Sequence, residues 1–459
     1  MQRLAILAGG GSLPLALAAS IQRRGDQAHI VGLLGEADKG IEAYPHTWVS
    51  LGSVNALLAT IRKQSDGVMV IAGVVSRPDL LRLKMDFGII RYLPQVLSLM
   101  KGGDDAVLTR VVRFFEGRGI VVKGVSDVAP ELLANEGVLA TGLEGSAQER
   151  AQTTVDTALG FEVLDLLGDL DVGQAIAVEA GRVLAIEGAE GTDRMLARVA
   201  VLRGATAAAS DLPRKGMRGV AVKGPKRGQD LRVDLPAVGA NTIGRLVEAR
   251  LGTLVVTSGN TLLLGRQEMI ERAKAENIAV HCIKRETEVS ARTVGRTMRF
   301  AGAAVGRVQA AAADAKDALT AADVTQRLAP YHCGRAAVVV RDHVLAIAAE
   351  EGPVAMAERV ASLRQWGRGR SARRLGAVAI RLDAAHDDVA EPVALIEALT
   401  SAGLAGVVLV RRDVRVAEAN ELPPRLLAAA EKHGLFLMEA VAADSAPGRG
   451  DGTDRGQNK

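Results

Sequence analysis

Three ionisable side chains stand at alternate positions of the segment GQDLRVDLP, residues 228–236: Asp230, Arg232 and Asp234. Alternate residues of an extended segment point to one face, so two carboxylates and a guanidinium would share one side of a strand. The chain just before adds three cations, Lys223, Lys226 and Arg227. A solvated edge strand is one interpretation of this pattern, and a site for charged chemistry is the other.

The chemical interpretation gives each charge a task on a phosphoryl group. Carboxylates four residues apart lie about 13 Å apart on a fully extended chain, and a turn at residues 231–233 would bring them closer. Asp230 and Asp234 would then hold Mg²⁺, or one of them would orient a water. Arg232 and Lys223 suit phosphoryl oxygens, where negative charge builds up during displacement. Which aspartate is the base and which is the metal ligand stays open.

The stretch GGGSLP, residues 9–14, lies between an apolar run and a helical pattern. It resembles a dinucleotide-binding fingerprint, but Pro14 stands where the third glycine would allow close helix packing. The remaining interpretation is an anion site, in which backbone N–H groups at the start of a helix bind phosphate. Its members are Gly10, Gly11 and Ser12, followed by Leu13. A tight turn without a ligand is the alternative.

Two further loops carry polar residues at the start of a predicted helix. EGAEGTD, residues 187–193, offers Thr192 and Asp193, either as a helix N-cap or as ligand contacts. GGDDAVL, residues 102–108, offers Asp104 or Asp105 as an N-cap.

The N-terminal region alternates apolar strands with amphipathic helices, which predicts a parallel, doubly wound sheet. The expected strands are residues 3–8, 27–34, 68–73 and 119–123, and the expected helices are residues 13–24, 53–64, 92–101 and 105–117. Ligands of such sheets bind at the carboxyl ends of the strands. The loops GGGSLP (residues 9–14) and AGVVSRPD (residues 72–79) follow two of these ends.

The rest of the chain repeats itself. Residues 171–203 align without gaps on residues 332–364, at an offset of 161, and 15 of these 33 positions are identical. The second copy keeps the apolar positions but not the charges, because Asp193 corresponds to Val354 and Arg232 to Val389. Asp387 remains near Glu391, which lies near the place of Asp234. We expect the first copy to hold the site and the second to be structurally sound but chemically inactive.

The predicted fold is α/β, a Rossmann-like N-terminal domain followed by two tandem copies of a second α/β domain. The expected divisions are residues 1–140 for the N-terminal domain, 141–285 for the catalytic-type domain, 286–305 for a connector, 306–441 for the degenerate repeat and 442–459 for a disordered tail.

Composition narrows the class of protein. Aromatic residues make up 2% of the 459 residues, which leaves few rings for base stacking and argues against a nucleic-acid partner. The net charge of +4 and the pI of about 9.1 favour anionic substrates or membrane surfaces. Cys282 and Cys333 are the only cysteines, which indicates a reducing compartment without a structural metal. No segment reaches the roughly 18–20 apolar residues of a membrane span, so the protein is expected to be soluble or peripheral.

With these residues in view, the chain resembles the UDP-2,3-diacylglucosamine pyrophosphatases of the lipid A pathway, of the type not built on a calcineurin-like phosphoesterase fold. The resemblance runs from the N-terminus to about residue 283 and rests on several motifs in order. They are GGGSLP, GGDDAVL with DVAPELL (residues 127–133), GRVLAIEGAEGTD, and GQDLRVDLP with GANTI (residues 239–243). The second copy, beyond residue 283, is an addition to this plan.

The resemblance implies hydrolysis of UDP-2,3-diacylglucosamine to UMP and 2,3-diacylglucosamine 1-phosphate, with Mg²⁺ and by water attack on the α-phosphorus. It places the catalytic aspartate in QDLRVD, where we choose Asp230 ahead of Asp234. It implies substrate contacts from the four GGGSLP residues named above and from Asp104, Asp105, Thr192, Asp193, Lys223, Gln229 and Thr242. A lipid-linked substrate implies that the protein is a cytoplasmic enzyme in peripheral contact with the inner face of the cytoplasmic membrane. Oligomeric state is open, and a homo-oligomer is compatible with the sequence.

Two rival functions fit parts of the sequence. A nicotinamide-dependent oxidoreductase is suggested by GGGSLP alone, and Glu36 is the only acid near the end of the second strand. A non-catalytic nucleotide-sugar binding or scaffold protein is suggested by the extra domain.

Overall fold

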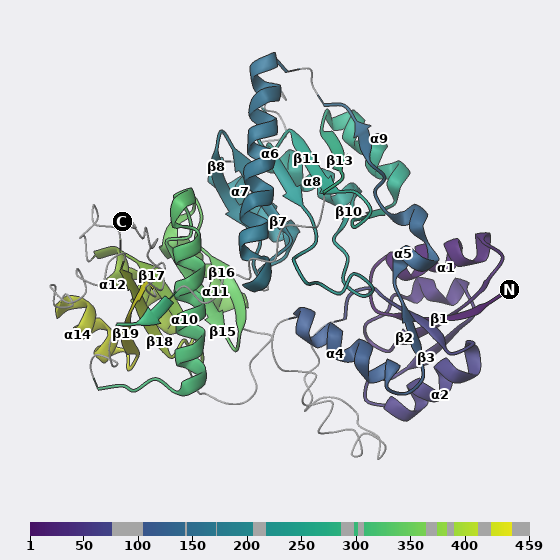
Figure 1. Cartoon of the computed structure of the whole chain (residues 1–459), viewed down its shortest axis with the longest axis horizontal. Helices are drawn as coiled ribbons and strands as arrows, with labels where there is room; N and C mark the ends of the chain where they lie inside the picture. Colours follow the sequence, from purple (N-terminus) through teal and green to yellow (C-terminus); the bar gives the residue numbers. More distant parts are fainter. Residues whose placement is uncertain are drawn as a thin grey trace, which may run out of the picture.

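The computed structural model describes residues 1–75, 104–142, 145–170, 172–204, 217–285, 298–301, 307–363, 374–382, 390–411 and 424–442. Three α/β units follow one another along the chain, coloured purple to blue, blue to teal, and green to yellow (Figure 1). The predicted fold class is therefore confirmed. The predicted helix at residues 92–101 and the tail after residue 442 lie outside the described residues.

The first unit is a five-stranded parallel sheet in the order β3-β2-β1-β4-β5. Its strands are β1 (Arg3–Ala8), β2 (Gln27–Leu33), β3 (His46–Val49), β4 (Val68–Ala72) and β5 (Val121–Lys123). Helices α1 (Leu13–Arg23) and α5 (Val125–Val128) cover one face, and α2 (Val54–Gln64) and α4 (Asp104–Glu116) cover the other. Because both faces of the sheet are buried, its strands are nearly continuous apolar runs. Such runs can be recognised in the sequence, and four of the five strands were predicted from them.

The strand order of this sheet reverses between β1 and β4, which is where parallel sheets of this type bind ligands. The loops after these two strands meet there, because Gly10 and Val74 form an isolated bridge. The sequence expectation that the loops after residues 8 and 72 share one edge of the sheet is thus confirmed.

The second unit is a six-stranded mixed sheet in the order β6-β13-β11-β9-β7-β8. Its strands are β6 (Gly137–Ala140), β7 (Ala175–Glu179), β8 (Arg182–Ile186), β9 (Val220–Lys223), β11 (Thr253–Thr257) and β13 (Ala279–Ile283). Helix α6 (Ala147–Leu167) covers one face, and α7 (Thr192–Leu202), α8 (Ala240–Glu248) and α9 (Arg266–Glu276) cover the other. A small parallel pair, β10 (Ala237–Gly239) and β12 (Leu262–Leu264), packs against the core of the first unit.

The third unit repeats this plan in the order β14-β19-β18-β17-β15-β16. Its strands are β14 (Met298–Phe300), β15 (Ala336–Val340), β16 (His343–Ile347), β17 (Ala377–Arg381), β18 (Gly406–Arg411) and β19 (Phe436–Ala442). Helix α10 (Ala312–Arg327) takes the place of α6, and α11 (Gly352–Leu363), α12 (Ala390–Ser401) and α14 (Pro424–Lys432) lie on the opposite face.

The first strand of each repeated unit lies outside the range expected for its domain. Strand β6 falls within residues 1–140 but pairs with β13 of the second sheet, and β14 falls within the expected connector but pairs with β19 of the third. The sequence offered little to place them, because each is a short edge strand of three or four residues.

A buried hydrogen-bonded carboxylate also recurs in the two copies at the offset of 161 residues. The Asp156 carboxylate on α6 accepts the N–H groups of Ala180 and Gly181 in the β7–β8 turn, at 2.9 and 2.7 Å. Its counterpart Asp317 on α10 accepts the N–H groups of Arg341 and Asp342 in the β15–β16 turn, both at 2.8 Å. Both turns contain non-glycine residues at positive φ, so a buried carboxylate holds the same unusual turn in each copy.

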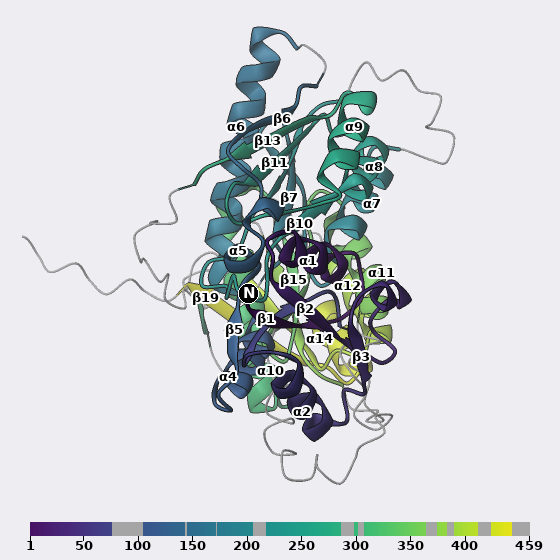
Figure 2. The same cartoon turned by 90° about the vertical axis from the view of Figure 1, so that its right-hand side faces the viewer.

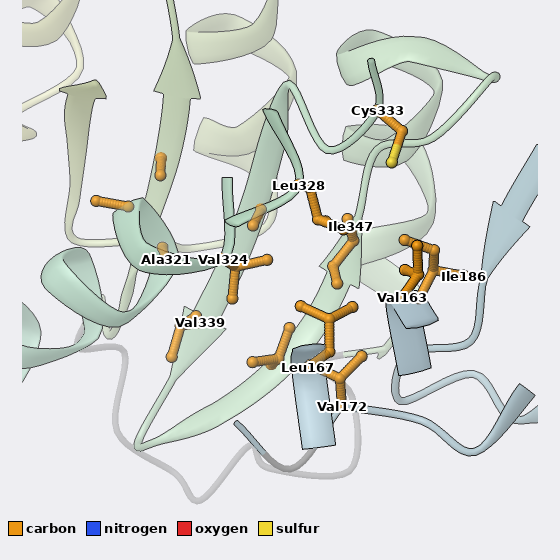
Figure 3. Close-up of a cluster of buried hydrophobic side chains, with 14 of the residues drawn as sticks. Val163, Leu167, Val172, Ile186, Ala321, Val324, Leu328, Cys333, Val339 and Ile347 are labelled. Atoms are coloured by element: carbon orange, nitrogen blue, oxygen red, sulfur yellow. The ribbon is translucent and has the colours of Figure 1, made fainter. Parts of the chain in front are cut away.

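The two copies share one hydrophobic core, shown in close-up in Figure 3. Side chains of α6, of the segment before β7 and of the end of β8 lie in one cluster with the corresponding side chains of the second copy. From the first copy come Val163, Leu167, Val172 and Ile186, and from the second come Val324, Leu328, Cys333 and Ile347. All eight are at most 5% exposed, so each copy covers the apolar face of the other. Turned by 90°, the molecule shows the first two units one above the other (Figure 2).

Candidate functional site

Residues 228–236 form a turn rather than an extended strand. The N–H groups of Val233 and Asp234 both donate to the carbonyl oxygen of Asp230, at 3.1 Å. The expectation of three side chains on one face of a strand is therefore wrong, and the alternative of a turn at residues 231–233 is confirmed. Alternation misled because it holds for side chains only while the backbone is extended, and here the backbone turns and Val233 packs against the core of the N-terminal unit.

Arg232 joins the turn to the N-terminal unit. Its guanidinium donates to both carboxylate oxygens of Asp230, from Nε at 2.9 Å and from Nη2 at 2.7 Å. Its Nη1 donates to Glu116 at the end of α4, at 2.7 Å. A Cβ on Gly124 would lie 3.1 Å from the Arg232 Cα, so the chain before α5 passes directly against this arginine. The turn thus sits where the N-terminal unit meets the first copy.

The same contacts set the charge state of Asp230. Hydrogen bonds from Arg232 hold the pKa of the Asp230 carboxyl below its usual range, although partial burial acts in the opposite direction. Hydrogen bonds to Asp230 and then to Glu116 likewise raise the pKa of Arg232, so it stays a cation. Asp230 is consequently an ionised carboxylate at neutral pH.

Asp234 faces a different partner. The Gln174 side-chain amide lies 3.3 and 3.4 Å from its two carboxylate oxygens, which are long hydrogen bonds. Gln229, expected to bind substrate, instead closes the turn: its Nε2 donates to the carbonyl oxygen of Asp234 at 2.6 Å, and its Oε1 accepts the N–H of Lys226 at 2.7 Å. It is buried, which suits this internal role.

Hydrogen bonds link the side chains of Lys223, Thr192 and Glu187 into a series, the polar chain. Lys223, at the end of β9, donates from Nζ to the Thr192 hydroxyl at 2.8 Å and to the Ala237 carbonyl oxygen at 3.0 Å. The Thr192 hydroxyl donates to the Glu187 carboxylate at 3.0 Å. Glu187 as a residue is partly exposed, but its carboxyl group is buried. This burial raises the pKa of the carboxyl, although the positive charge of Lys223 acts to lower it. The backbone of Gln174 also contacts this carboxylate, which links the polar chain to Asp234.

Polar residues at the starts of α7 and α8 have specific partners within the protein. The N-cap of α7 is Gly191, so neither Thr192 nor Asp193 caps it as one interpretation proposed. Asp193 is exposed and accepts a hydrogen bond from Asn241 of α8 at 2.7 Å. Thr242, expected to bind substrate, is buried and accepts the N–H of Gly239 at the start of α8 at 3.3 Å.

The GGGSLP loop holds an anion that belongs to the protein itself. The N–H of Gly11 donates to the Asp38 carboxylate at 2.7 Å, and the N–H of Gly10 donates to the Val74 carbonyl oxygen at 2.8 Å. Two of the three amides predicted to bind a substrate anion are therefore engaged. Ser12 is the N-cap of α1 and makes no side-chain cap hydrogen bond. Leu13 is the first residue of that helix and packs against the core of the N-terminal unit.

Some predicted residues fall on parts of the chain whose side chains the structure does not describe. Asp104 and Asp105 are the first two residues of α4 rather than the cap residue before it, and nothing is described of their side chains. In the second copy, Asp387 and Val389 lie outside the described residues, and Glu391 is described only as part of α12.

The second copy has lost the polar chain as a unit. Lys223 pairs with Ala175 in the sheet, and its counterpart by register is Ile380, which pairs with Ala336. At the offset of 161, Gln174 and the other members of the chain are replaced as well: Gln174 by Arg335, Glu187 by Ala348 and Thr192 by Pro353. The sequence reasoning missed Gln174, Glu187 and Glu116. The repeat alignment carried the signal for the first two, since both change where the core does not.

The carboxylates of the turn bear on the expected Mg²⁺. Within the described ranges, no group of three or more His, Cys, Asp or Glu side chains is arranged to hold a metal ion. Mg²⁺ is commonly bound by one or two carboxylates together with substrate phosphates rather than by a protein cage. Asp234 fits such a role, because the hydrogen bonds that the structure gives its carboxylate are the two long ones from Gln174. Asp230 is largely neutralised by Arg232.

The two cysteines are free thiols in the sheet cores. Burial raises the pKa of Cys282 to about 11 and that of Cys333 to about 12, so neither is a nucleophile at neutral pH. Among the helices that the structure describes, none is both long enough and apolar enough to cross a membrane.

The structure is a parallel α/β domain followed by two copies of a second α/β domain, and comparison with known proteins identifies the family of these domains. The LpxI N-terminal domain matches residues 3–132, and the LpxI C-terminal domain matches twice, over residues 140–281 and 301–438. The UDP-2,3-diacylglucosamine pyrophosphatase LpxI of Caulobacter vibrioides is 34% identical over 273 residues, which are 60% of this chain and 94% of that protein. The chain belongs to the LpxI family, with its C-terminal domain present in two copies, which confirms the resemblance.

The lowered pKa of Asp230 has a consequence for stability. A depressed pKa means that the Asp230–Arg232 pair stabilises the fold above the ordinary aspartate pKa of about 3.9, and that this contribution is lost as the pH falls through the folded value. We expect the melting temperature of Arg232→Met to lie below that of the wild type at neutral pH, with the difference shrinking in acid. Thermal denaturation followed by circular dichroism over this pH range measures it.

Glu116→Gln is the matched control, because it removes the other partner of Arg232 and leaves the Asp230 bonds in place. Its difference from the wild type should change less with pH. A difference for Arg232→Met that is the same in acid as at neutral pH would contradict the assignment.

Proposed function

We propose that this protein hydrolyses the pyrophosphate of UDP-2,3-diacylglucosamine, giving UMP and 2,3-diacylglucosamine 1-phosphate in lipid A biosynthesis. The observation that carries the proposal is the turn 228–236, which holds Asp230 and Arg232 together at the junction of two domains. The same turn carries Asp234, which Gln174 links to the chain of Glu187, Thr192 and Lys223. Family membership and the activity named for the Caulobacter relative support the substrate class. The oxidoreductase alternative loses its main support, since amides of the GGGSLP loop are engaged by Asp38 and Val74.

The proposed reaction forms a bond between a water oxygen and the α-phosphorus. The bond from the α-phosphorus to the bridging oxygen breaks, and that oxygen leaves with the sugar 1-phosphate. Asp230, ionised and fixed by Arg232, is our choice for the group that orients the water and accepts its proton. Arg232 and Lys223 supply positive charge where negative charge develops on the phosphoryl oxygens.

Mg²⁺, when bound with the substrate, would neutralise part of the diphosphate charge. Asp234 is the carboxylate best placed to share such an ion, with Asp230 as the second candidate. The other substrate contacts that we propose are those of Ser12, Leu13, Asp104, Asp105, Thr192 and Asp193. Gly10, Gly11, Gln229 and Thr242 would act by shaping the loops that carry them, since their polar groups already have partners inside the protein.

Hydrolysis in ¹⁸O-water tests the position of attack. We expect the label in UMP, because the water oxygen joins the α-phosphorus, and we expect turnover to stop with EDTA and to return with added Mg²⁺. Mass spectrometry of both products measures the label. Label in the sugar 1-phosphate would show attack at the other phosphorus, and full turnover in EDTA would exclude the metal. Absence of hydrolysis would favour the alternative of a nucleotide-sugar binding or scaffold protein.

We further propose that the protein takes its two-chain substrate from the cytoplasmic leaflet of the inner membrane by peripheral contact. Large apolar side chains are exposed at the edge of the N-terminal sheet where its loops meet: Leu34 after β2, and Val74 and Val75 after β4. Such side chains, on a protein of net positive charge, suit a surface of anionic lipid.

Sedimentation with anionic vesicles tests this contact. We expect binding to weaken as salt rises, because surface charges are screened, and to weaken further in Val74→Ser. Val201→Ser is the control, since Val201 is equally exposed but lies on α7, away from this edge. Binding that resists high salt and alkaline wash would indicate insertion into the membrane. Equal binding by both variants would show that the membrane contact lies on another surface of the protein.

A further inference from the structure

The second copy of the C-terminal domain has no chemistry assigned to it, yet it touches the loop that carries part of the site. Residues 187–191 connect β8 to α7. Glu187 stands at the beginning of this loop and Thr192 directly after its end, and both belong to the polar chain that holds Lys223. We propose that the second copy braces this loop and thereby positions Thr192 and Lys223 for the reaction. The inference rests on the proposed function for its catalytic part.

The backbone of the loop lies directly on the second copy. The N–H of Ala189 donates to the carbonyl oxygen of Leu345 in β16, at 3.0 Å. A Cβ on Gly188 would lie 2.6 Å from that same oxygen, closer than real side chains approach, so the neighbouring position must be glycine. Two consecutive residues of the site loop are therefore fitted to one peptide of the other copy.

Ion pairs hold Glu190, the next residue of the loop. Glu190 is almost fully buried and pairs with Arg198 of its own copy at 2.5 Å and with Arg359 of the second copy at 3.0 Å. Arg359 also pairs with Glu351 at 2.8 Å, and Arg198 reaches the same carboxylate at 2.9 Å. The side chains of all four are at most 15% exposed, so little water screens the attraction. Removing one partner of such a buried group is costly.

The contacts between the two copies are symmetric, but only one of the two loops they hold carries site residues. The backbone hydrogen bond and the ion pairs have counterparts at the offset of 161: the N–H of Glu350 donates to the carbonyl oxygen of Leu184, as the N–H of Ala189 donates to that of Leu345, and Arg198 pairs with Glu351 as Arg359 pairs with Glu190. This is the geometry of an interface between two identical subunits, built here within one chain. In the second copy, however, the braced loop is residues 348–351, and Ala348 and Pro353 stand where Glu187 and Thr192 stand in the first copy, so it has no polar chain to position. Only the support given to the first copy acts on a site.

Arg359→Ala tests the brace in the full-length chain. It removes the second copy's contact with Glu190 and leaves Arg198 in place, so the protein is expected to fold. We expect amide hydrogen exchange in residues 187–193 to rise, and kcat to fall by about tenfold to a hundredfold, because small misplacements of catalytic groups cost this much. The KM should change far less. Arg359→Lys, which retains the charge but not the forked geometry, should restore part of both readouts.

Glu350→Gln is the matched control. It removes the ion pair with Arg182, which crosses the same interface but ends on the loop of the second copy that carries no site. It should leave both readouts at the wild-type value. Unchanged exchange in Arg359→Ala would overturn the brace, and raised exchange with an unchanged kcat would overturn the positioning role. If the wild type itself shows no turnover, the proposed function fails, while the exchange comparison still decides whether the second copy holds the loop.

Discussion

The apolar face formed by α6 and the end of β8 cannot be left in water, and the rest of the structure depends on how it is covered. Val163, Leu167 and Ile186 are at most 1% exposed and share one buried cluster with apolar side chains of the second copy. Full burial of such a side chain is worth about 1.5–3 kcal/mol. The duplication supplies this cover within the chain, and it brings β16 and Arg359 to the loop that leads to the site.

Charge is tolerated at the site because each buried group has a partner. Lys223 rests on Thr192 and a carbonyl oxygen, and the Glu187 carboxyl is enclosed beside them. In the second copy these positions became Ile380, Pro353 and Ala348, so no member was left as an unpaired buried charge. Keeping only one of them would have been costly, which gives a physical reason for their joint loss.

The fold was largely predictable, whereas the geometry of the site was not. Strands such as β1 and β4 are local apolar runs with helices between them, so periodicity found them; β3 was missed because HTWV is short and half-polar. The repeat was visible as an offset of 161. The contacts that define the site join distant residues: Gly11 to Asp38, Arg232 to Glu116, and Glu190 to Arg359 across 169 positions. Packing of the domains selects such pairs, and local sequence carries little trace of them.

The central claim is that the turn 228–236 of the first copy performs the hydrolysis. Steady-state turnover of UDP-2,3-diacylglucosamine by Asp230→Ala tests it most directly, with Glu116→Gln as a control that changes the other partner of Arg232. The account predicts a loss of about a hundredfold or more for Asp230→Ala, with a circular dichroism spectrum that shows an intact fold and with turnover largely retained in the control. A folded Asp230→Ala variant that keeps more than about a tenth of the wild-type rate would contradict it.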